Sequence, residues 1–219
     1  EEGNALRMDW QEVLPAGECN YIMGNPPFVG YSLQSKEQKA DMLDIYVDEK
    51  GKSYKTAGKI DYVAGWYFKA AEYIQNTGVR TAFVSTNSIT QGEQVAAVWK
   101  PLYDRFGIHI DFAWRTFIWN SESNEKAHVH CVIIGFGCSD NNHMKNLYEL
   151  SSPKMVKDIN PYLVEGKPVF IEARRKPICD VPVFVRGSQP TDDGNFIFTA
   201  EEKNVFLAKE PQAEKFIRP

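Results

Sequence analysis

The sequence predicts an α/β fold built around a mixed β-sheet, and three observations lead to this prediction. Short apolar segments that end in turn residues alternate with longer segments whose apolar residues recur at three-and-four spacing. Two further segments, 108–117 and 127–136, have the composition of strands, but only a polar loop separates them. A helical crossover does not fit in so short a connection, so these two strands are expected to pair antiparallel.

The first strand and the first helix are expected at 19–25 and 35–46. Residues 19–25, CNYIMGN, are a short apolar run that ends in turn residues, which is typical of a buried strand. The helix opens with Ser35, and Gln38 follows three residues later, which is the spacing of a capping box. The segment 49–59 is rich in Gly, Lys and Ser and is expected to be a loop.

A long amphipathic helix is expected over 61–78, where Asp61 can cap the start and Gly78 can close the end. Its apolar residues recur at helical spacing. They are Val63, Trp66, Tyr67, Ala70, Ala71 and Ile74.

A buried strand is then expected at 79–86 and a helix at 88–107. Ser88, with Gln91 three residues on, can cap this helix. Pro101 lies inside it and is expected to kink or interrupt it, because proline lacks the N–H that an interior helix position needs.

The character of the sequence changes after Gly137. Residues 137–146 are polar and have the composition of a linker, and residues 147–196 are rich in proline with no sustained period, so irregular structure is expected. A helix is expected over 199–217. We therefore predict one domain over 1–137 and a linker with the start of a second domain over 138–219.

Composition limits the kinds of partner. The chain has 25 basic and 29 acidic residues, a net charge of −4, so a polyanion would bind through local patches or through parts of the protein outside this chain. The four cysteines form no C-x-x-C pair, which favours reduced thiols in a cytoplasmic protein. The longest apolar run, 129–137, is too short to span a bilayer, so no membrane partner is expected. Both ends of the sequence are abrupt, and we expect a fragment of a longer protein.

The segment Asn25-Pro26-Pro27-Phe28 follows the first predicted strand. Ligands of open α/β sheets bind at the carboxyl ends of strands, so this is where a site would lie. The Asn25 side-chain oxygen and the Pro26 carbonyl are both acceptors, and the prolines hold them rigid. Two such acceptors can grip both hydrogens of one NH₂ group, while Phe28 offers a flat apolar face to a planar ring. A stiff turn with Phe28 in the core would explain the same four residues.

The motif GNPPF resembles the catalytic motif of the class I S-adenosylmethionine-dependent methyltransferases that modify the exocyclic amine of adenine in DNA. Four further segments are similar to motifs of that family, in the family's order. They are NALRMDW, the helix that Asp61 opens, TAFVSTNSITQGEQ, and RTFIW with VHCVIIGF. Several of these segments are most similar to the methyltransferase region of single-chain restriction–modification enzymes of type IIG, also called type IIL.

The resemblance implies that residues 1–137 are the C-terminal half of a Rossmann-like sheet whose last strand is antiparallel. The remainder would lead to a target-recognition domain. The family's Gly-rich cofactor loop and ribose-binding acid belong upstream of Asp9 and are absent here, so the S-adenosylmethionine site is expected to be incomplete and the isolated fragment inactive. The implied partners are double-stranded DNA with a flipped adenine and the rest of the parent polypeptide, of which a nuclease is a candidate part.

The resemblance also assigns roles to single residues. Asp9 matches the acid that hydrogen-bonds the cofactor, and Asn25 would contact cofactor and base. Phe117 best matches the ring that packs on the flipped base with Phe28, and Trp119 is the alternative.

Other candidates depend on weaker observations. Trp66 could line the cofactor side, although a core position in the amphipathic helix explains it better. Arg174, Arg175 and Lys176 could contact DNA phosphates, or form a solvated charge cluster. His128 and His130 share a strand face, but no second ligand cluster has zinc spacing, so we expect no metal.

Two other functions fit the same residues. The Asn-Pro-Pro-aromatic arrangement suits any planar NH₂ group, so cytosine N4 or a protein glutamine is an alternative substrate. A DNA-binding fragment without catalytic activity is an alternative of a different class.

Overall fold

The computed structural model divides the chain into two units, Glu1–Ala173 and Arg174–Pro219, which we describe separately. The residues that it describes are 2–119, 129–139, 143–149, 152–174, 176–182, 193–195 and 197–217.

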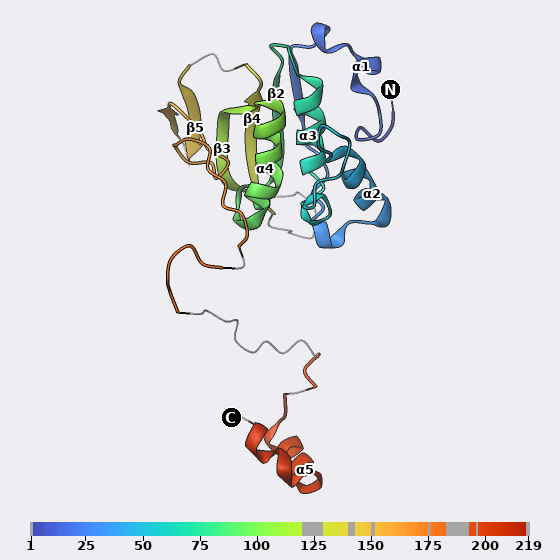
Figure 1. Ribbon diagram of the computed structural model, residues 1–219, viewed down its shortest axis with the longest axis vertical. Helices are drawn as coiled ribbons and strands as arrows, with labels where there is room; N and C mark the ends of the chain where they lie inside the picture. The colour runs from blue at the N-terminus through green and yellow to red at the C-terminus, as the bar shows by residue number, and fades with distance from the viewer. Residues whose placement is uncertain are drawn as a thin grey trace. The chain divides into compact units, whose positions relative to one another are not determined.

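The first unit contains a six-stranded mixed sheet of order β1-β2-β4-β3-β5-β6 (Figure 1). Its strands are β1 (Tyr21–Gly24), β2 (Arg80–Thr86), β3 (His109–Trp119), β4 (Val129–Gly137), β5 (Lys145–Glu149) and β6 (Ser152–Val156). Strand β1 runs parallel to β2, and β3 runs parallel to β5. Strand β4 lies antiparallel to both β2 and β3, which confirms the pairing expected from the short connection between β3 and β4.

The helices of the first unit are α1 (Trp10–Val13), α2 (Lys36–Ile45), α3 (Ala64–Tyr73) and α4 (Gly92–Phe106). The described residues also contain 3₁₀ turns, at Ala16–Glu18, Tyr31–Leu33, Ala57–Lys59, Asn87–Thr90 and Pro211–Phe216. The capping box at the start of α2 is confirmed, since the Ser35 hydroxyl accepts from the N–H of Gln38 and the Gln38 side chain accepts from the N–H of Ser35. Helix α4 ends at Gly107, whose positive φ of 61° is the left-handed conformation that favours glycine.

Two helix predictions were wrong in detail. Helix α3 begins at Ala64, with Val63 in the cap position, so Asp61 does not cap it. Pro101 lies inside α4 without interrupting it, because the side chains around it are buried and hold the helix against the sheet.

The prediction of irregular structure from residue 147 onward was wrong for the residues that belong to β5 and β6. Strands β5 and β6 form an antiparallel hairpin that adds to the edge of the sheet at β3. Trp114 on β3 stacks on Tyr148 of β5, with ring centroids 5.0 Å apart and planes 5° apart. This contact between distant segments stabilises a pairing that neither segment's own pattern predicts.

The main core lies between the sheet and the helices α3 and α4, which cover one face (Figure 1). Tyr67 of α3 stacks on Phe136 of β4 and meets Phe83 of β2 edge to face, at centroid distances of 5.3 and 5.2 Å. Because side chains alternate along a strand, the neighbours of these core residues point to the opposite face.

We call that opposite surface the open face, and it carries a band of large apolar side chains. Its members, which are exposed or half-buried, are Met23, Val84, Phe112, Trp114, Ile133 and Tyr148. Met23 is 83% exposed. The ring of Phe112 lies over Gly135, where a Cβ would come within 2.0 Å of the ring, so only glycine fits beneath it.

The second unit contains helix α5 (Ala200–Lys209) and the Pro211–Phe216 turn. A capping box between Thr199 and Glu202 opens α5, which confirms the start of the helix predicted at 199. The helix ends at Lys209, before Pro211, whereas the prediction continued it to 217.

Candidate active site

The loop Asn25–Phe28, which we call the acceptor loop, leaves β1 at its carboxyl end. Asn25 and Pro27 are exposed, Pro26 is buried and Phe28 is half-buried. The parallel strands β1, β2 and β3 all end at this edge of the sheet, as the sequence predicts for a ligand site of an α/β fold.

Neither candidate acceptor of this loop has a hydrogen-bond partner among the described residues. Within the part of the chain that the structure describes, no hydrogen bond reaches the Asn25 side-chain oxygen or the Pro26 carbonyl. The fold uses neither of these two neighbouring acceptors, so both are available to a ligand.

Backbone contacts fix the chain just beyond the acceptor loop. The N–H of Tyr62 donates to the carbonyl of Val29 at 2.9 Å, and the N–H of Leu33 donates to the carbonyl of Gly30 at 2.9 Å. The N–H of Tyr31 donates to Asp61 Oδ1 at 3.1 Å. The acceptor loop is therefore held at both ends, by β1 before it and by the segment at Asp61–Tyr62 after it.

Asp61 is a nearly buried acceptor, not a helix cap. Asp61 is 7% exposed. Its carboxylate accepts hydrogen bonds from the Ser88 hydroxyl, from Gln94 Nε2 and from the N–H of Tyr31. Ser88, which the sequence suggested as a cap of the next helix, lies in the Asn87–Thr90 turn and uses its hydroxyl for Asp61 instead.

A cleft of about 560 Å³ lies beside β1, and we call it the β1 cleft. Asn25, Pro26 and Pro27 line one part of it, and Trp66 and Phe83 line another. Other lining residues come from the segment before β1, among them Met8, Trp10, Val13, Leu14 and Cys19, and Ile22 of β1 also lines the cleft. The cleft thus has a mainly apolar and aromatic lining with the acceptor loop at its border, which is the usual composition of a small-molecule site.

The structure brings Trp66 and Asn25 to the same cleft, but it keeps Asp9 and Phe28 out of the cleft lining. Trp66 is half-buried and meets the ring of Tyr62 edge to face at 5.1 Å. Asp9 is exposed between the lining residues Met8 and Trp10, and its Oδ1 accepts from the N–H of Gln11 at 2.8 Å as the cap of α1.

Asp41 anchors the segment that carries Asp9. Its carboxylate accepts from Arg7 Nε at 2.7 Å, from the Tyr62 hydroxyl at 2.8 Å and from Asn4 Nδ2 at 3.3 Å. Burial alone would raise the pKa of Asp41, but the hydrogen bonds from Arg7 and Tyr62 outweigh it and hold the pKa below its usual value. Asp41 is therefore charged at neutral pH and fixes this segment to α2.

The two candidate stacking rings lie at the same edge of the sheet as the acceptor loop. Phe117 pairs with Cys131, and Cys131 pairs with Thr86 at the carboxyl end of β2. Phe117 is half-buried and Trp119 is 43% exposed, and their ring centroids lie 6.3 Å apart with planes at 44°. Neither ring lines the β1 cleft, so stacking by either remains a prediction.

The candidate phosphate contacts belong to the second unit. Arg174 and Lys176 are exposed, and neither makes an ion pair with another described residue. Arg175 lies outside the described residues, as does His128.

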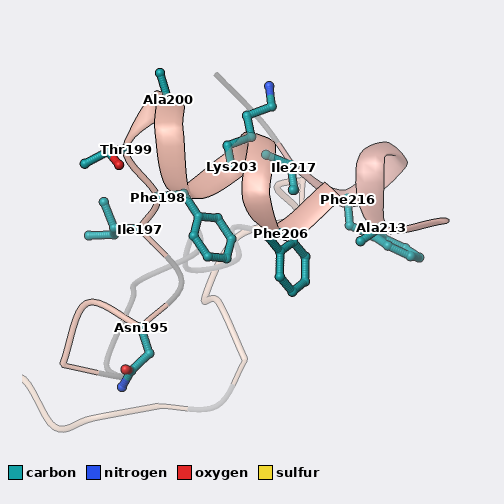
Figure 2. A pocket seen from close by; sticks show the side chains of 10 residues that line it. All are labelled: Asn195, Ile197, Phe198, Thr199, Ala200, Lys203, Phe206, Ala213, Phe216 and Ile217. Carbon is teal, nitrogen blue, oxygen red and sulfur yellow. The ribbon is translucent and has the colours of Figure 1, made fainter. Parts of the chain in front are cut away.

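A second hollow, of about 960 Å³, lies within the second unit (Figure 2). Phe198 and Phe206 stack there with centroids 5.1 Å apart, and Phe216 and Ile217 add apolar surface from the 3₁₀ turn and its end. Among the described residues that line it, Lys203 is the charged one, and none is a predicted site residue.

Three further observations concern the described part of the chain. No group of three His, Cys, Asp or Glu side chains there could hold a metal ion. No helix there is long and apolar enough to cross a bilayer. All four cysteines are free thiols.

Comparison with known proteins identifies the family. Residues 1–149 match the family model described as "MmeI, DNA-methyltransferase domain". The chain belongs to the MmeI family of DNA methyltransferases. Residues 165–219 match a second model of the MmeI family, described as its target recognition domain. Both matches agree with the order of parts that the motif resemblance implies.

Two relatives are similar over almost the whole chain. "DNA methyltransferase A" of Bacillus subtilis (strain 168) is 40% identical over 217 residues, which are 98% of this chain and 24% of that protein. The solved structure of the type IIL restriction–modification enzyme MmeI in complex with DNA is 50% identical, with a TM-score of 0.86, over 98% of this chain and 29% of that one. The chain thus spans about a quarter of the length of these relatives.

These findings confirm the resemblance to the methyltransferase region of type IIL restriction–modification enzymes. The mixed sheet is the C-terminal portion of a methyltransferase fold, and a portion of a recognition domain follows it. Sequence reasoning missed the supporting residues Asp41 and Tyr62 and gave Asp61 the wrong role. The signal that could have warned of this is that Ala64, three residues after Asp61, is not the Glu or Gln of a capping box.

Proposed function

We propose that the parent protein of this chain transfers a methyl group from S-adenosylmethionine to the N6 amine of adenine in DNA. The observation that carries this proposal is the pair of unpaired acceptors, the Asn25 side-chain oxygen and the Pro26 carbonyl, on a loop that borders an apolar cleft. Membership in a family of DNA methyltransferases supports it.

The acceptor loop suits an aromatic amine for a chemical reason. The lone pair of the adenine N6 amine is delocalised into the ring, which makes the nitrogen a poor nucleophile. Two acceptors that bind both of its hydrogens draw them out of the ring plane and direct the lone pair away from the π-system. Asn25 and Pro26 would do this by position and electrostatics, with no covalent enzyme intermediate.

The residues of the β1 cleft fit a cofactor of the S-adenosylmethionine class. When bound, S-adenosylmethionine supplies an electrophilic methyl group. Its apolar and aromatic parts would contact Trp66, and Asp9, whose second carboxylate oxygen is free of hydrogen bonds within the described residues, would accept from its adenine amine. Asn25 would hold the methyl donor and the base next to each other. The rest of the site would come from the upstream half of the parent, so this chain alone would be inactive.

DNA would reach the site with its target base rotated out of the helix. Phe28 and Phe117, or Trp119 in place of Phe117, would offset part of the unstacking cost of a few kcal/mol by stacking on the base. Arg174, Arg175 and Lys176 would contact phosphates at the start of the recognition domain. The match to a target recognition domain model supports a DNA partner over a protein one.

The remainder of the parent polypeptide would cover the open face. A sheet that packs helices on one face only leaves large apolar side chains such as Met23 and Trp114 in water, and exposed patches of this kind mark interaction sites. The upstream cofactor-binding half is the expected occupant, with a nuclease as a further part of the chain. Such an enzyme would act in the cytoplasm, where bacterial DNA lies.

The test is methyl transfer by the full-length parent with tritium-labelled S-adenosylmethionine. DNA is digested to nucleosides, and we expect the label on N6-methyl-2′-deoxyadenosine. Label only on N4-methylcytosine or on protein would contradict the proposal. We expect Asn25→Ala to lower the single-turnover rate by about 100-fold or more, the size seen when one preorganised polar group is removed from a transition-state site. The control is Asn20→Ala, which removes an exposed amide at the other end of β1 and should leave the methylation rate unchanged.

A further inference from the structure

We propose that Asp61 is a positioning residue, which holds the acceptor loop in a fixed place relative to the carboxyl end of β2. The proposal rests on the proposed methyl transfer, since the acceptor loop is the feature that Asp61 would position. Asp61 does not line the β1 cleft, so it would act through the loop and not on the substrate.

The first contact is with the main chain that follows the acceptor loop. Asp61 Oδ1 accepts from the N–H of Tyr31 at 3.1 Å, three residues after Phe28. The neighbouring N–H of Tyr62 donates to the carbonyl of Val29 at 2.9 Å. The side chain of Asp61 and the backbone of Tyr62 thus bind the same short stretch.

The second set of contacts reaches the turn after β2. The Ser88 hydroxyl donates to Asp61 Oδ2 and lies 2.9 Å from the hydroxyl of Thr86, the last residue of β2. Gln94 of α4 donates from Nε2 to Asp61 Oδ1 at 3.3 Å, and its Oε1 accepts from the N–H of Asp61 at 3.3 Å. One carboxylate therefore links the loop after β1, the turn after β2 and the start of α4.

The chemistry of this arrangement points to a geometric role. A carboxylate that is only 7% exposed needs compensation, and Asp61 makes no ion pair with a Lys, Arg or His among the described residues. Its compensation is three neutral donors from three elements. Hydrogen bonds to a charged carboxylate are strong and directional. Asp61 can therefore fix the distances between the three elements that supply its donors.

Removal of this link would affect the reaction through the position of Asn25. The acceptors must lie at hydrogen-bond distance from an amine that also faces a methyl donor, and a displacement of about 1 Å can lower the rate about 100-fold. An asparagine at position 61 keeps the shape and can still accept from Tyr31 while its NH₂ donates to Ser88. Alanine can do neither.

The experiment compares Asp61→Ala, Asp61→Asn and Ser88→Ala in the full-length parent. Asp111→Asn is the control. Asp111, like Asp61, is a carboxylate with little exposure, but its partner is Arg80 and it lies near the start of β3, at the other edge of the sheet. Single-turnover methylation at saturating DNA and cofactor is measured together with the melting temperature. Hydrogen–deuterium exchange of the peptide that spans residues 25–34 reports directly on the loop.

We expect Asp61→Ala to lower the methylation rate at least 30-fold and to speed exchange in residues 25–34, with the dissociation constant for DNA changed less than threefold. Asp61→Asn should stay within about fivefold of the wild-type rate, and Ser88→Ala should fall between the two. Equal rates for Asp61→Ala and wild type, or unchanged exchange in this peptide, would overturn the proposal. The proposal would also be overturned if Asp61→Asn lowered the methylation rate as much as Asp61→Ala does. The same holds if the control Asp111→Asn lowered the rate by that amount.

The two proposals fail in different ways. A parent that methylates cytosine or protein contradicts the proposed function, while the rates and the exchange data still test the role of Asp61. A parent that methylates adenine but keeps its rate in Asp61→Ala contradicts only the positioning role.

Discussion

The hydroxyl of Tyr62 donates a hydrogen bond to Asp41 Oδ2 at 2.8 Å, and both residues are buried. The contact joins the segment before α3 to helix α2. Because Asp41 also binds Arg7 and Asn4, the same carboxylate connects the chain near the acceptor loop with the chain near Asp9. The candidate base-binding and cofactor-binding segments are thus linked through one buried acid.

The stability that Asp41 contributes should depend on pH. Its pKa is lowered in the folded state, so its contribution is complete above the unfolded pKa of about 3.9 and is lost as pH falls through the folded pKa. We expect Asp41→Asn to lower the free energy of unfolding by about 1–3 kcal/mol at pH 7, the usual cost for hydrogen bonds to a charged group. Urea unfolding at pH 7 and pH 3 checks this, and the difference from wild type should shrink at pH 3. Asp44→Asn, an exposed residue of the same helix, should show no such change.

Phe117 should matter more for base stacking than Trp119. Stacking of a base on an aromatic ring contributes about 1–3 kcal/mol, so we expect Phe117→Ala to lower the methylation rate of the parent by about 5- to 150-fold. Fluorescence of 2-aminopurine at the methylated position should also change, since the ring would quench a stacked base. Trp119→Ala is the comparison, and a larger effect there would assign the role to Trp119 instead.

Arg174 and Lys176 should contribute to the salt dependence of DNA binding. Each phosphate contact that is lost reduces the slope of log K against log salt by about 0.9. The double variant Arg174→Ala/Lys176→Ala of the parent should therefore have a slope smaller by nearly two, measured by fluorescence anisotropy at several salt concentrations. Lys167→Ala removes an exposed lysine nearby in the sequence and serves as the control. An unchanged slope in the double variant would mean that these residues form a solvated cluster.

Gly135→Ala should destabilise the sheet. The new Cβ would lie 2.0 Å from the ring of Phe112, so that ring must move, and overpacking of this kind costs about 1–3 kcal/mol. Gly17→Ala adds the same methyl group with no neighbour within 4 Å and should be close to neutral. Thermal unfolding of both variants separates the two cases, and equal melting temperatures would show that Phe112 has room to move.

The sequence could predict those features that depend on near neighbours in the chain. The capping box at Ser35 is complete within four residues and appears as expected, and the helix predicted from Thr199 begins there with a capping box as local in the sequence. The location of the acceptor loop also follows locally, because an apolar run followed by Pro-Pro must end a strand.

Features that depend on distant contacts were not predictable in this way. The partners of Asp61 lie as far away as Gln94, and an aspartate before a helix looks the same in sequence whether it caps the helix or binds elsewhere. Strand β6 buries only Val156, and its pairing with β5 depends on the packing of β5 against β3. Contacts between distant segments, and not local propensity, therefore determine the role of Asp61 and the position of β6.

The hairpin of β5 and β6 has a consequence for the construction of chimeras between members of the MmeI family. The chain beyond the hairpin remains attached to the first unit, since Ile159 and Leu163 are buried there and Phe170 packs on Tyr103 of α4 with centroids 5.5 Å apart. A splice placed at the end of the catalytic motifs, near residue 137, would exchange two strands of the sheet along with the recognition segment. A splice after Ala173 would leave the sheet and its core intact, so donor recognition domains should be joined there.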